Sequence, residues 1–343
     1  MIKKIGNALL VVSVAAGLVL GFLYYNLFLK NINFPDEKLY VYVKTNSTFE
    51  DVLEYLDEHK IVSNNIVFRE FAKLRNLHNN IHPGRYTIPK GMSKNELILL
   101  LRSGQSDEIT ITFYNLKNLK ELTEHVSKYI EAKESDLYDL LTSPHTHQKL
   151  GFNKNNFISL FIPNSYRFYW NTTAEDFLNR MQQEYKNFWN DERKNKARNM
   201  RLTQAQISTL ASIVQAEQAE REEEWPVIAG LYYNRLQQGI KLQSDPTVIY
   251  AVGDFSIRRV LHKHLQYNSP YNTYYYQGLP PGPIRISSIK AIDAVLNHQK
   301  HNYIYMCAKP KSGGLHVFTA SYDEHLKNAR NFQNHLDNLN IKE

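Results

Sequence analysis

The sequence contains very little cysteine. Its 343 residues include one, Cys307, so no disulfide can form within the chain, and the cellular compartment must be inferred from other features. No cysteine lies close to the N-terminus, which argues against a lipid anchor of the lipoprotein type. The sequence also contains no internal repeat and no low-complexity tract.

Patterns typical of nucleic-acid binding and of metal sites are missing as well. The formal net charge of +7 suits an anionic partner such as nucleic acid, anionic lipid or an acidic cell-wall polymer. The densest basic run, Arg193 to Arg201, is interrupted by asparagine and accompanies no nucleic-acid motif. The His-x-His pairs His145/His147 and His262/His264 have no HExxH pattern or bridging carboxylate beside them. We therefore predict no nucleic-acid partner and no metal.

One long apolar run is present, at the N-terminal end. Ile5 to Leu29 carries no charge, and a helix of this length rises about 37 Å, enough to cross a hydrocarbon layer of about 30 Å. Lys3 and Lys4 precede it, so residues 1–4 are expected in the cytoplasm and the rest outside. The alternative is a cleaved signal peptide, whose apolar core is shorter, about 7–15 residues. We favour an uncleaved, single-pass anchor in the inner membrane.

Residues 38–113 are predicted to form a small α+β unit. The pattern predicts the order strand, helix, helix, strand, helix, strand, with strands at Leu39–Val43, Gly84–Ile88 and Ile109–Phe113. Capping boxes, Ser47 with Glu50 and Ser93 with Glu96, mark the starts of two helices. The first four elements resemble a LysM-type module, a fold often used to hold N-acetylated glycans. A spacer that binds nothing is the alternative.

The second helix of this unit is expected from about Asn64 to Arg75. Its apolar residues are predicted to face inward, namely Ile66, Val67, Phe71 and Leu74. Beyond this unit, residues 114–200 are mostly helical and polar by pattern. From residue 201 the composition changes, and most candidate chemistry follows.

A helix predicted from about Gln204 carries an unusual carboxylate. Glu217 shares the apolar face of this helix with Leu210 and Val214. Burial disfavours the charged form and raises the pKa of a carboxyl, and a protonated carboxyl near neutral pH is what a general acid requires. A buried structural carboxylate paired with an arginine or tyrosine is the alternative. By contrast, the run from Glu220 to Glu224 is predicted to be solvated.

Several polar residues follow on the next segments. Asn234 is expected on the packed side of a second helix, where a buried amide must bond to structure or to a ligand. Gln243, Ser244 and Asp245 precede a proline, so their donors and acceptors are held in an extended turn. Asp245 is expected at least to cap a helix there.

An aromatic, turn-rich loop contains Tyr271, Asn272 and Thr273. Pyranose rings stack on tyrosine faces, and asparagine and threonine side chains bond sugar hydroxyls. Tyrosine-rich loops are also common as plain packing elements. Further along, His316 is expected on a short strand after a glycine turn, facing opposite to Val317.

Several of these motifs follow one another between Leu210 and Phe318: LASIVQAEQA, YYNRL, LQSDPTVIYAVG, YNTY, GLPPGPI and HVF. In this order they resemble the YceG/MltG family of endolytic murein transglycosylases. The predicted anchor and LysM-like unit match the layout of that family, so the resemblance covers most of the chain. It implies an α+β protein with a transmembrane helix, a LysM-like subdomain, a helical connecting region (114–200) and a mixed α/β catalytic domain (201–343).

The resemblance implies that Glu217 is the catalytic residue. Many relatives have a second acid two positions earlier, where this sequence has Gln215, which cannot supply a proton. The cleft implied by the resemblance is lined by Asn234, Gln243, Ser244, Asp245, Tyr271, Asn272 and Thr273. The implied reaction cleaves the MurNAc–GlcNAc β-1,4 bond of peptidoglycan without water and leaves 1,6-anhydro-MurNAc ends.

Two other accounts stay open at this point. A muramidase with two carboxylates would need Asp245 as its second acid, and a membrane-anchored scaffold would bind glycan without cutting it. The family has also been labelled an aminodeoxychorismate lyase, which needs a pyridoxal cofactor. No lysine here lies in an evident cofactor setting, so we predict no cofactor. The expected partners are glycan strands, the membrane and, by resemblance, wall-synthesis enzymes.

Overall fold

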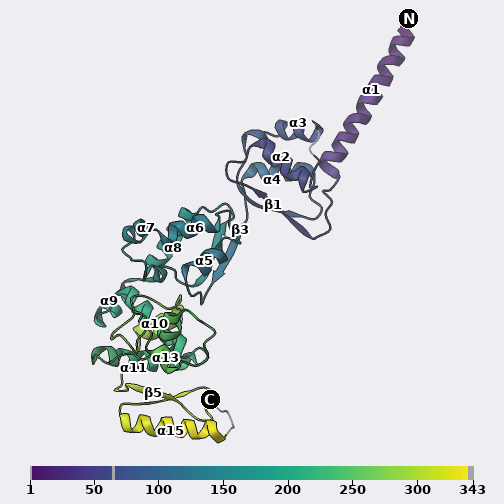
Figure 1. Cartoon of the computed structure of the whole chain (residues 1–343). Helices are drawn as coiled ribbons and strands as arrows, with labels where there is room; N and C mark the ends of the chain where they lie inside the picture. Colours follow the sequence, from purple (N-terminus) through teal and green to yellow (C-terminus); the bar gives the residue numbers. More distant parts are fainter. Residues whose placement is uncertain (1, 64–65, 339–343) are drawn as a thin grey trace. The chain divides into compact units, whose positions relative to one another are not determined.

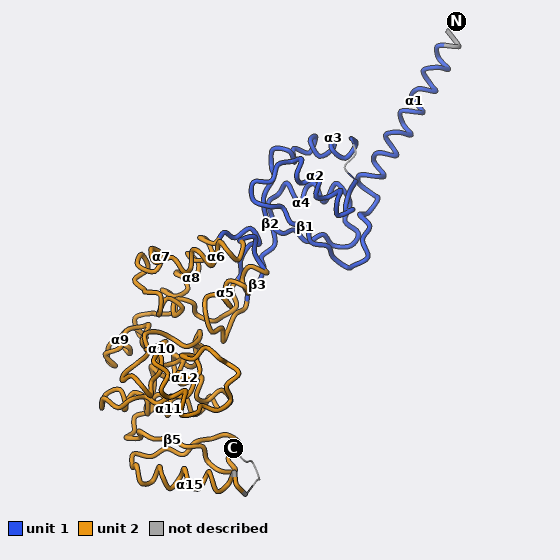
Figure 2. The backbone as a smooth tube through the Cα atoms, in the orientation of Figure 1, with its two compact units in different colours: residues 1–111, 129–132, 167–173 blue, residues 112–128, 133–166, 174–343 orange. Residues whose placement is uncertain are grey.

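The computed structural model describes residues 2–63 and 66–338. They divide into two compact units (Figure 2). The first comprises residues 1–111, 129–132 and 167–173, and the second comprises residues 112–128, 133–166 and 174–343. The fold is α+β, and the strands of the described residues form three two-stranded sheets. The finer division at residues 38, 114 and 201 stays a prediction.

The first unit begins with an apolar helix (Figure 1). Helix α1 spans Ile2–Tyr24 and continues into a π-helical turn, Tyr25–Leu29. The segment Ile5–Leu29, with a mean hydropathy of 2.2, is long and apolar enough to cross a membrane. At its end, the ring of Phe28 lies 5.5 Å from that of Phe71. Residue 1 of the predicted tip lies outside the described residues.

The remaining elements of the first unit follow the predicted order. They are β1 (Lys38–Val43), α2 (Phe49–Glu58), α3 (Ile66–Leu74), a 3₁₀ turn (Leu77–Asn79), β2 (Gly84–Pro89), α4 (Lys94–Ser103) and β3 (Glu108–Phe113). Strand β1 pairs antiparallel with β2, so that Val41 lies opposite Tyr86. Both side chains are buried with Leu53 of α2 and Leu97 of α4. The alternating apolar positions of the strands therefore close one core with two helices.

The helix starts in this unit confirm one capping box and correct the other. Ser93 and Glu96 form the predicted reciprocal pair at the start of α4. The start of α2 lies one residue later than expected, since Thr48 has the extended backbone of an N-cap and Asp51 completes the box. The third residue after the cap, rather than Glu50, is thus the one that can reach back to the cap N–H.

The predicted buried face of α3 is largely wrong. Ile66, Val67 and Leu74 are exposed, whereas Phe68 and Ala72 are buried. The helix has apolar residues on several sides, so its sequence is compatible with more than one inward face. The packing selects the face with Phe68 and Ala72, four residues apart. The predicted start at Asn64 lies outside the described residues.

The second unit is built mainly from helices. Its N-terminal elements are α5 (Leu119–Val126), α6 (Glu134–Thr142), α7 (Pro144–Lys149), a 3₁₀ turn (Phe157–Leu160), α8 (Ala174–Phe188) and α9 (Asp191–Asn199). Strand β4 (Asn164–Tyr169), like β3, has residues in both units. Then follow α10 (Gln204–Glu217), a 3₁₀ turn (Glu222–Glu224), α11 (Trp225–Gln237), α12 (Asp245–Val252), α13 (His262–Leu265), α14 (Ile289–Leu296), β5 (Tyr305–Ala308), β6 (His316–Thr319) and α15 (Tyr322–Asn338).

The core of this unit is formed by α10, α11 and α14. Leu210 and Ile213 of α10 are fully buried with Ile228 of α11 and Val295 of α14. In the described part of the predicted C-terminal domain, the strands form one antiparallel hairpin, β5–β6, and α15 packs on it (Figure 1). Residues 339–343 of that domain lie outside the described residues. Helix α10 therefore emerges from an apolar core with its C-terminal end at Glu217.

Candidate active site

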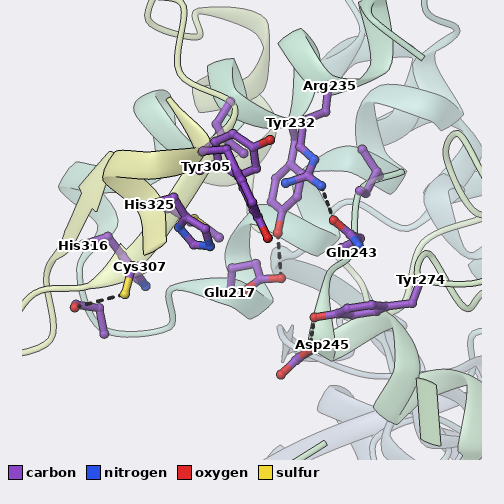
Figure 3. Close-up of a pocket in the computed structure, with 15 residues that line it drawn as sticks. Glu217, Tyr232, Arg235, Gln243, Asp245, Tyr274, Tyr305, Cys307, His316 and His325 are labelled. Carbon is purple, nitrogen blue, oxygen red and sulfur yellow. Dashed lines mark hydrogen bonds between the residues drawn. The ribbon is translucent and has the colours of Figure 1, made fainter. Parts of the chain in front are cut away.

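A cavity of about 380 Å³ is lined by residues from α10, α11, β5, β6, α15 and the start of α12 (Figure 3). Carboxylate, guanidinium, imidazole and phenol groups are concentrated in it, which suits a polar ligand. Its lining consists of Glu217, Leu231, Tyr232, Arg235, Leu242, Gln243, Asp245, Tyr274, Tyr305, Met306, Cys307, Ala308, His316, Tyr322 and His325.

Glu217 extends into this cavity from the last position of α10. Its Oε1 accepts a hydrogen bond from the Tyr232 hydroxyl at 2.8 Å (Figure 3). The same oxygen accepts another from the Ser244 hydroxyl. No hydrogen bond of the described residues involves Oε2 of Glu217. The two donors therefore fix one oxygen and leave the other for a proton or a ligand.

The environment of Glu217 favours its neutral form. Burial has the largest effect and raises the pKa of Glu217, because protein atoms surround the carboxyl although part of the residue reaches the cavity. The hydrogen bonds from Ser244 and Tyr232 lower this pKa, while the charges of Asp245 and His316 raise and lower it, respectively. The C-terminal end of α10 adds to the effect of burial, since the helix dipole disfavours a negative charge there. The net pKa shift is upward.

Ser244 reaches Glu217 from a constrained turn. The preceding Gln243 has a φ of 55°, a left-handed conformation that is uncommon for residues other than glycine. The Ser244 N–H donates to Oγ1 of Thr273 at 3.0 Å. Ser244 occupies the N-cap position of α12, yet its side chain makes no capping hydrogen bond. Its hydroxyl is committed to Glu217 instead, an exception to ordinary helix capping that is typical of functional positions.

Gln243 and Asp245 flank Ser244, and both line the cavity. Oε1 of Gln243 accepts a hydrogen bond from the guanidinium of Arg235, and the Tyr274 hydroxyl donates to Oδ1 of Asp245 at 2.7 Å. Asp245 is the first residue of α12 rather than its cap, so the predicted capping role is wrong by one residue. Its carboxylate still lies in the first helical turn, where the dipole favours a negative charge.

The loop containing Tyr271, Asn272 and Thr273 supports the site from outside the cavity lining. Thr273 is buried and bonds the Ser244 backbone. The Asn272 amide is buried and donates to backbone carbonyls of its own loop, including that of Tyr267 at 2.8 Å. The Tyr271 ring packs on that of another tyrosine, with centroids 4.8 Å apart. The structure therefore gives these side chains internal partners.

Asn234 also lies outside the cavity lining. Its amide donates to the carbonyls of His301 at 2.7 Å and Tyr303 at 3.0 Å. These bonds hold the segment before β5 along α11, together with the His301 ring, which lies 3.0 Å from the Val227 carbonyl. The sequence predicted that the Asn234 amide bonds either to the protein or to a ligand, and its acceptors here are backbone carbonyls of the protein.

Glu224 is not part of a solvated charge run, contrary to prediction. It is 7% exposed, and its two oxygens meet the backbone N–H of His316 at 2.8 Å and the imidazole Nδ1 at 2.7 Å. The Gln218 amide donates to it at 2.9 Å. Burial opposes ionisation, yet these bonds hold the pKa of Glu224 below its usual value. The pair fixes the His316 ring at the cavity wall.

Sequence reasoning missed several lining residues. Tyr232 and Arg235 lie three residues apart on one face of α11, and that spacing is the signal that indicates a shared face. The signal is weak because α11 is buried on several sides. Tyr305 and His325 come from β5 and α15, and no spacing in the sequence connects them with Glu217.

In residues 2–63 and 66–338, no group of three or more histidine, cysteine, aspartate or glutamate side chains is arranged to hold a metal ion. One of the paired histidines, His147, is buried, and its Nε2 lies 2.7 Å from the Leu141 carbonyl.

Comparison with known proteins gives relatives along most of the chain. An endolytic murein transglycosylase of Bacillus subtilis is 30% identical over 313 residues, which cover 87% of this chain and 83% of that protein. One from Streptococcus pneumoniae is 25% identical over 83% of this chain and 57% of its own length. A crystal structure of a YceG-like protein from Listeria monocytogenes matches with a TM-score of 0.56 at 23% identity, covering 85% of this chain and 98% of that one.

The structural match concerns the fold alone, at that level of identity. The sequence evidence is stronger, since the model of one family, described as the YceG-like family, matches residues 41–331. That span includes Glu217 and every residue placed around it above. With this match and the relative from Bacillus subtilis, the chain belongs to the YceG-like family.

Proposed function

We propose that this protein is a membrane-anchored lytic transglycosylase that cleaves the MurNAc–GlcNAc β-1,4 bond within peptidoglycan strands. The observation that carries the proposal is Glu217, a carboxyl with a raised pKa whose Oε1 is fixed by two hydroxyl donors inside a polar cavity. Relatives named endolytic murein transglycosylases support the substrate and the internal position of the cut.

The reaction needs one acid that also serves as a base. Protonated Glu217 donates from Oε2 to the glycosidic oxygen, and the bond from MurNAc C1 to that oxygen breaks. The resulting carboxylate accepts the proton of the MurNAc C6 hydroxyl while the oxygen of that hydroxyl bonds to C1 of the same sugar. The product is a 1,6-anhydro-MurNAc end, no water is consumed, and Glu217 regains its proton. The donors on Oε1 stabilise the intervening carboxylate, while burial restores the neutral form.

We assign the other predicted residues to two groups. Gln243 and Asp245 contact the glycan, because they line the cavity. The remaining residues position the site through internal hydrogen bonds or packing: Ser244, Thr273, Asn234, Asn272 and Tyr271.

The test is product analysis on purified murein with the wild-type protein and Glu217→Gln. Mass spectrometry should find anhydro-MurNAc ends after wild-type digestion and almost none with the variant. The glutamine side chain keeps an oxygen that can accept both hydrogen bonds, so we expect the variant to fold. An unchanged circular dichroism spectrum checks this. Equal cleavage by the folded variant would reject Glu217 as the acid, and binding without any cleavage by the wild type would favour a glycan-binding scaffold.

A hydrolytic muramidase is the second candidate, because Asp245 lines the same cavity as Glu217. In that mechanism Asp245 activates water or attacks C1, and the products have reducing MurNAc ends. The Tyr274 hydroxyl bonded to Asp245 would then orient the second carboxylate. The same mass analysis separates the two reactions, since the anhydro end is lighter by one water molecule.

The N-terminal part is proposed to hold the enzyme at its substrate. The apolar helix over Ile5–Leu29 anchors the chain in the inner membrane, with the N-terminus in the cytoplasm and Glu217 outside. The β1–α2–α3–β2 unit is a LysM-like module that contacts N-acetylated glycan near peptidoglycan synthases. Protease protection in spheroplasts tests the orientation, and glycan pull-down with the full chain tests the module.

A further inference from the structure

Arg235 places a buried cation in the lining of the cavity that contains the proposed acid. The residue is 7% exposed and lines the cavity together with Glu217. Its Nε donates to the Lys241 carbonyl at 2.9 Å, Nη1 to the Ile304 carbonyl at 3.0 Å, and Nη2 to Oε1 of Gln243. All of these acceptors are neutral, so hydrogen bonding holds the guanidinium in place without compensating its charge.

No carboxylate in the described part of the chain forms an ion pair with Arg235. The acids nearest the cavity have other partners: Glu217 binds the Tyr232 and Ser244 hydroxyls, Asp245 binds the Tyr274 hydroxyl, and Glu224 binds His316. A histidine of α15, His325, also lines the cavity. Burial lowers the pKa of Arg235, although a guanidinium stays charged in proteins. A buried cation without a counter-ion is costly, which points to an anion supplied by a ligand.

The guanidinium also keeps N–H groups without a protein acceptor in the described part of the chain. It carries five N–H groups, and three of them have protein acceptors. Arg235 follows Tyr232 by three positions on α11, a rise of about 4.5 Å, and Tyr232 bonds Glu217 directly. Arg235 and Glu217 therefore line one cavity and are linked through neighbouring positions of α11.

We propose that Arg235 binds a carboxylate carried by the muramyl residue next to the bond that is cut. The inference rests on the proposed function. GlcNAc and MurNAc differ by the lactyl ether on C3 of MurNAc, so an alternating strand presents the acid with two bonds that are otherwise alike. A cation in the same cavity as the acid recognises the muramyl substituent and sets which bond is cleaved. Paired N–H groups of arginine match a carboxylate in geometry and in charge.

The carboxylate has two sources. In strands without stem peptides it is the lactyl carboxylate itself. In strands with stem peptides the lactyl group is an amide, and the nearest carboxylate belongs to the stem. Three substrates of equal length separate these sources: stem-free strands, stem-free strands whose carboxylates are converted to methylamides, and strands bearing stems.

The experiment measures kcat and KM on these substrates for the wild type, Arg235→Lys, Arg235→Gln and a control, Lys241→Gln, which removes an exposed cation nearby. For the wild type, we expect KM to be about 10- to 100-fold higher on the neutral strands than on the acidic ones. Arg235→Gln should abolish this difference and Arg235→Lys should keep part of it. The control should leave it unchanged. A low KM on stem-bearing strands identifies the stem carboxylate as the ligand, and a high one identifies the lactyl group.

Equal wild-type KM values on acidic and neutral strands would overturn the proposal, and this result does not depend on whether any variant folds. An equal loss of kcat on all substrates in Arg235→Gln, with the wild-type preference kept, would assign Arg235 a purely structural role. If the wild type cleaves nothing, the proposed function fails separately. In that case, calorimetric binding of acidic and neutral strands to the wild-type chain still decides whether the anion site exists.

Discussion

Two regions of the molecule differ in how many polar side chains they bury: residues 38–113 and the region around the cavity. In the first, Ser93 is the one buried polar side chain among the described residues, and the acids Asp51 and Glu96 lie at helix N-termini. In the second, Glu224, Arg235 and Ser244 are buried with polar partners. The first arrangement favours a stable fold. The second costs free energy of folding, because polar groups are removed from water, and such a cost is typical of functional sites.

Glu96 and Glu217 make this comparison at the level of one residue type. Glu96 accepts hydrogen bonds from the Ser93 cap at the start of α4, and these bonds lower its pKa. Glu217 ends α10 in a buried setting, which raises its pKa. Position in a helix and access to water thus shift the pKa values of these two glutamates in opposite directions.

The largest effect is expected for Glu217→Gln. Turnover should fall about 10³-fold, as for loss of an acid–base catalyst. The variant should be more stable than the wild type at pH 8. Because the pKa of Glu217 is raised by folding, its ionisation lowers the free energy of unfolding of the wild type. This loss is absent below the ordinary pKa of about 4.3 and grows as the pH rises through the folded-state pKa. Thermal unfolding at pH 4 and pH 8, with exposed Glu220→Gln as the control, tests the sign. A variant less stable than the wild type at pH 8 would contradict this account.

Leu53→Ala should destabilise the first region without changing chemistry. Leu53 is fully buried, so we expect the free energy of unfolding to fall by about 2–5 kcal/mol. Leu74→Ala, at an exposed position of α3, is the matched control and should cost less than about 0.5 kcal/mol. Urea unfolding followed by circular dichroism measures both. Similar losses for the two leucines would mean that the buried face of α3 is assigned incorrectly.

Glu224→Ala should cost about 1–3 kcal/mol, because the His316 N–H and ring lose their acceptor in a buried place. Glu223→Ala, one residue earlier and exposed, should change stability very little. Calorimetric melting of both variants provides the comparison. If the two melt alike, Glu224 belongs to the solvated run that its sequence suggests.

Glu96→Ala should cost about 1 kcal/mol at neutral pH and leave turnover unchanged. The pKa of Glu96 is lowered, so its contribution is present above its ordinary pKa and is lost as pH falls through the folded-state value. The stability difference from the wild type should therefore shrink in acid, the opposite pH dependence to that of Glu217. Melting curves from pH 3 to pH 8 measure this trend, and a constant difference would refute it.

Local patterns predicted much of the first region. The strand alternation of Glu108–Phe113 and the cap of Ser93 with Glu96 are determined by neighbours in the sequence, so they could be read directly. The face of α3 could not, since a helix with apolar residues on several sides leaves the choice to tertiary packing. Capping at Thr48 differed by one residue because two adjacent residues could each act as the cap.

The site was predictable only where one helix carried the signal. Glu217 stands out by its helical spacing from apolar neighbours, and the motifs identify the turn around Ser244. The bond between those two residues joins segments 27 positions apart, and no local rule predicts it. Glu224 resembles its solvated neighbours in sequence, and its burial depends on His316, 92 positions away. Contacts between residues so far apart in the sequence can be identified only from the three-dimensional structure.

The central claim is that burial raises the pKa of Glu217 above that of an exposed glutamate. The most direct measurement is carbon-13 NMR of glutamate carboxyls titrated with pH, with the Glu217 signal assigned by its absence in Glu217→Gln. We predict that this carboxyl titrates at a higher pH than the exposed glutamates, because burial raises its pKa. A titration at the ordinary value near 4.3 would contradict it.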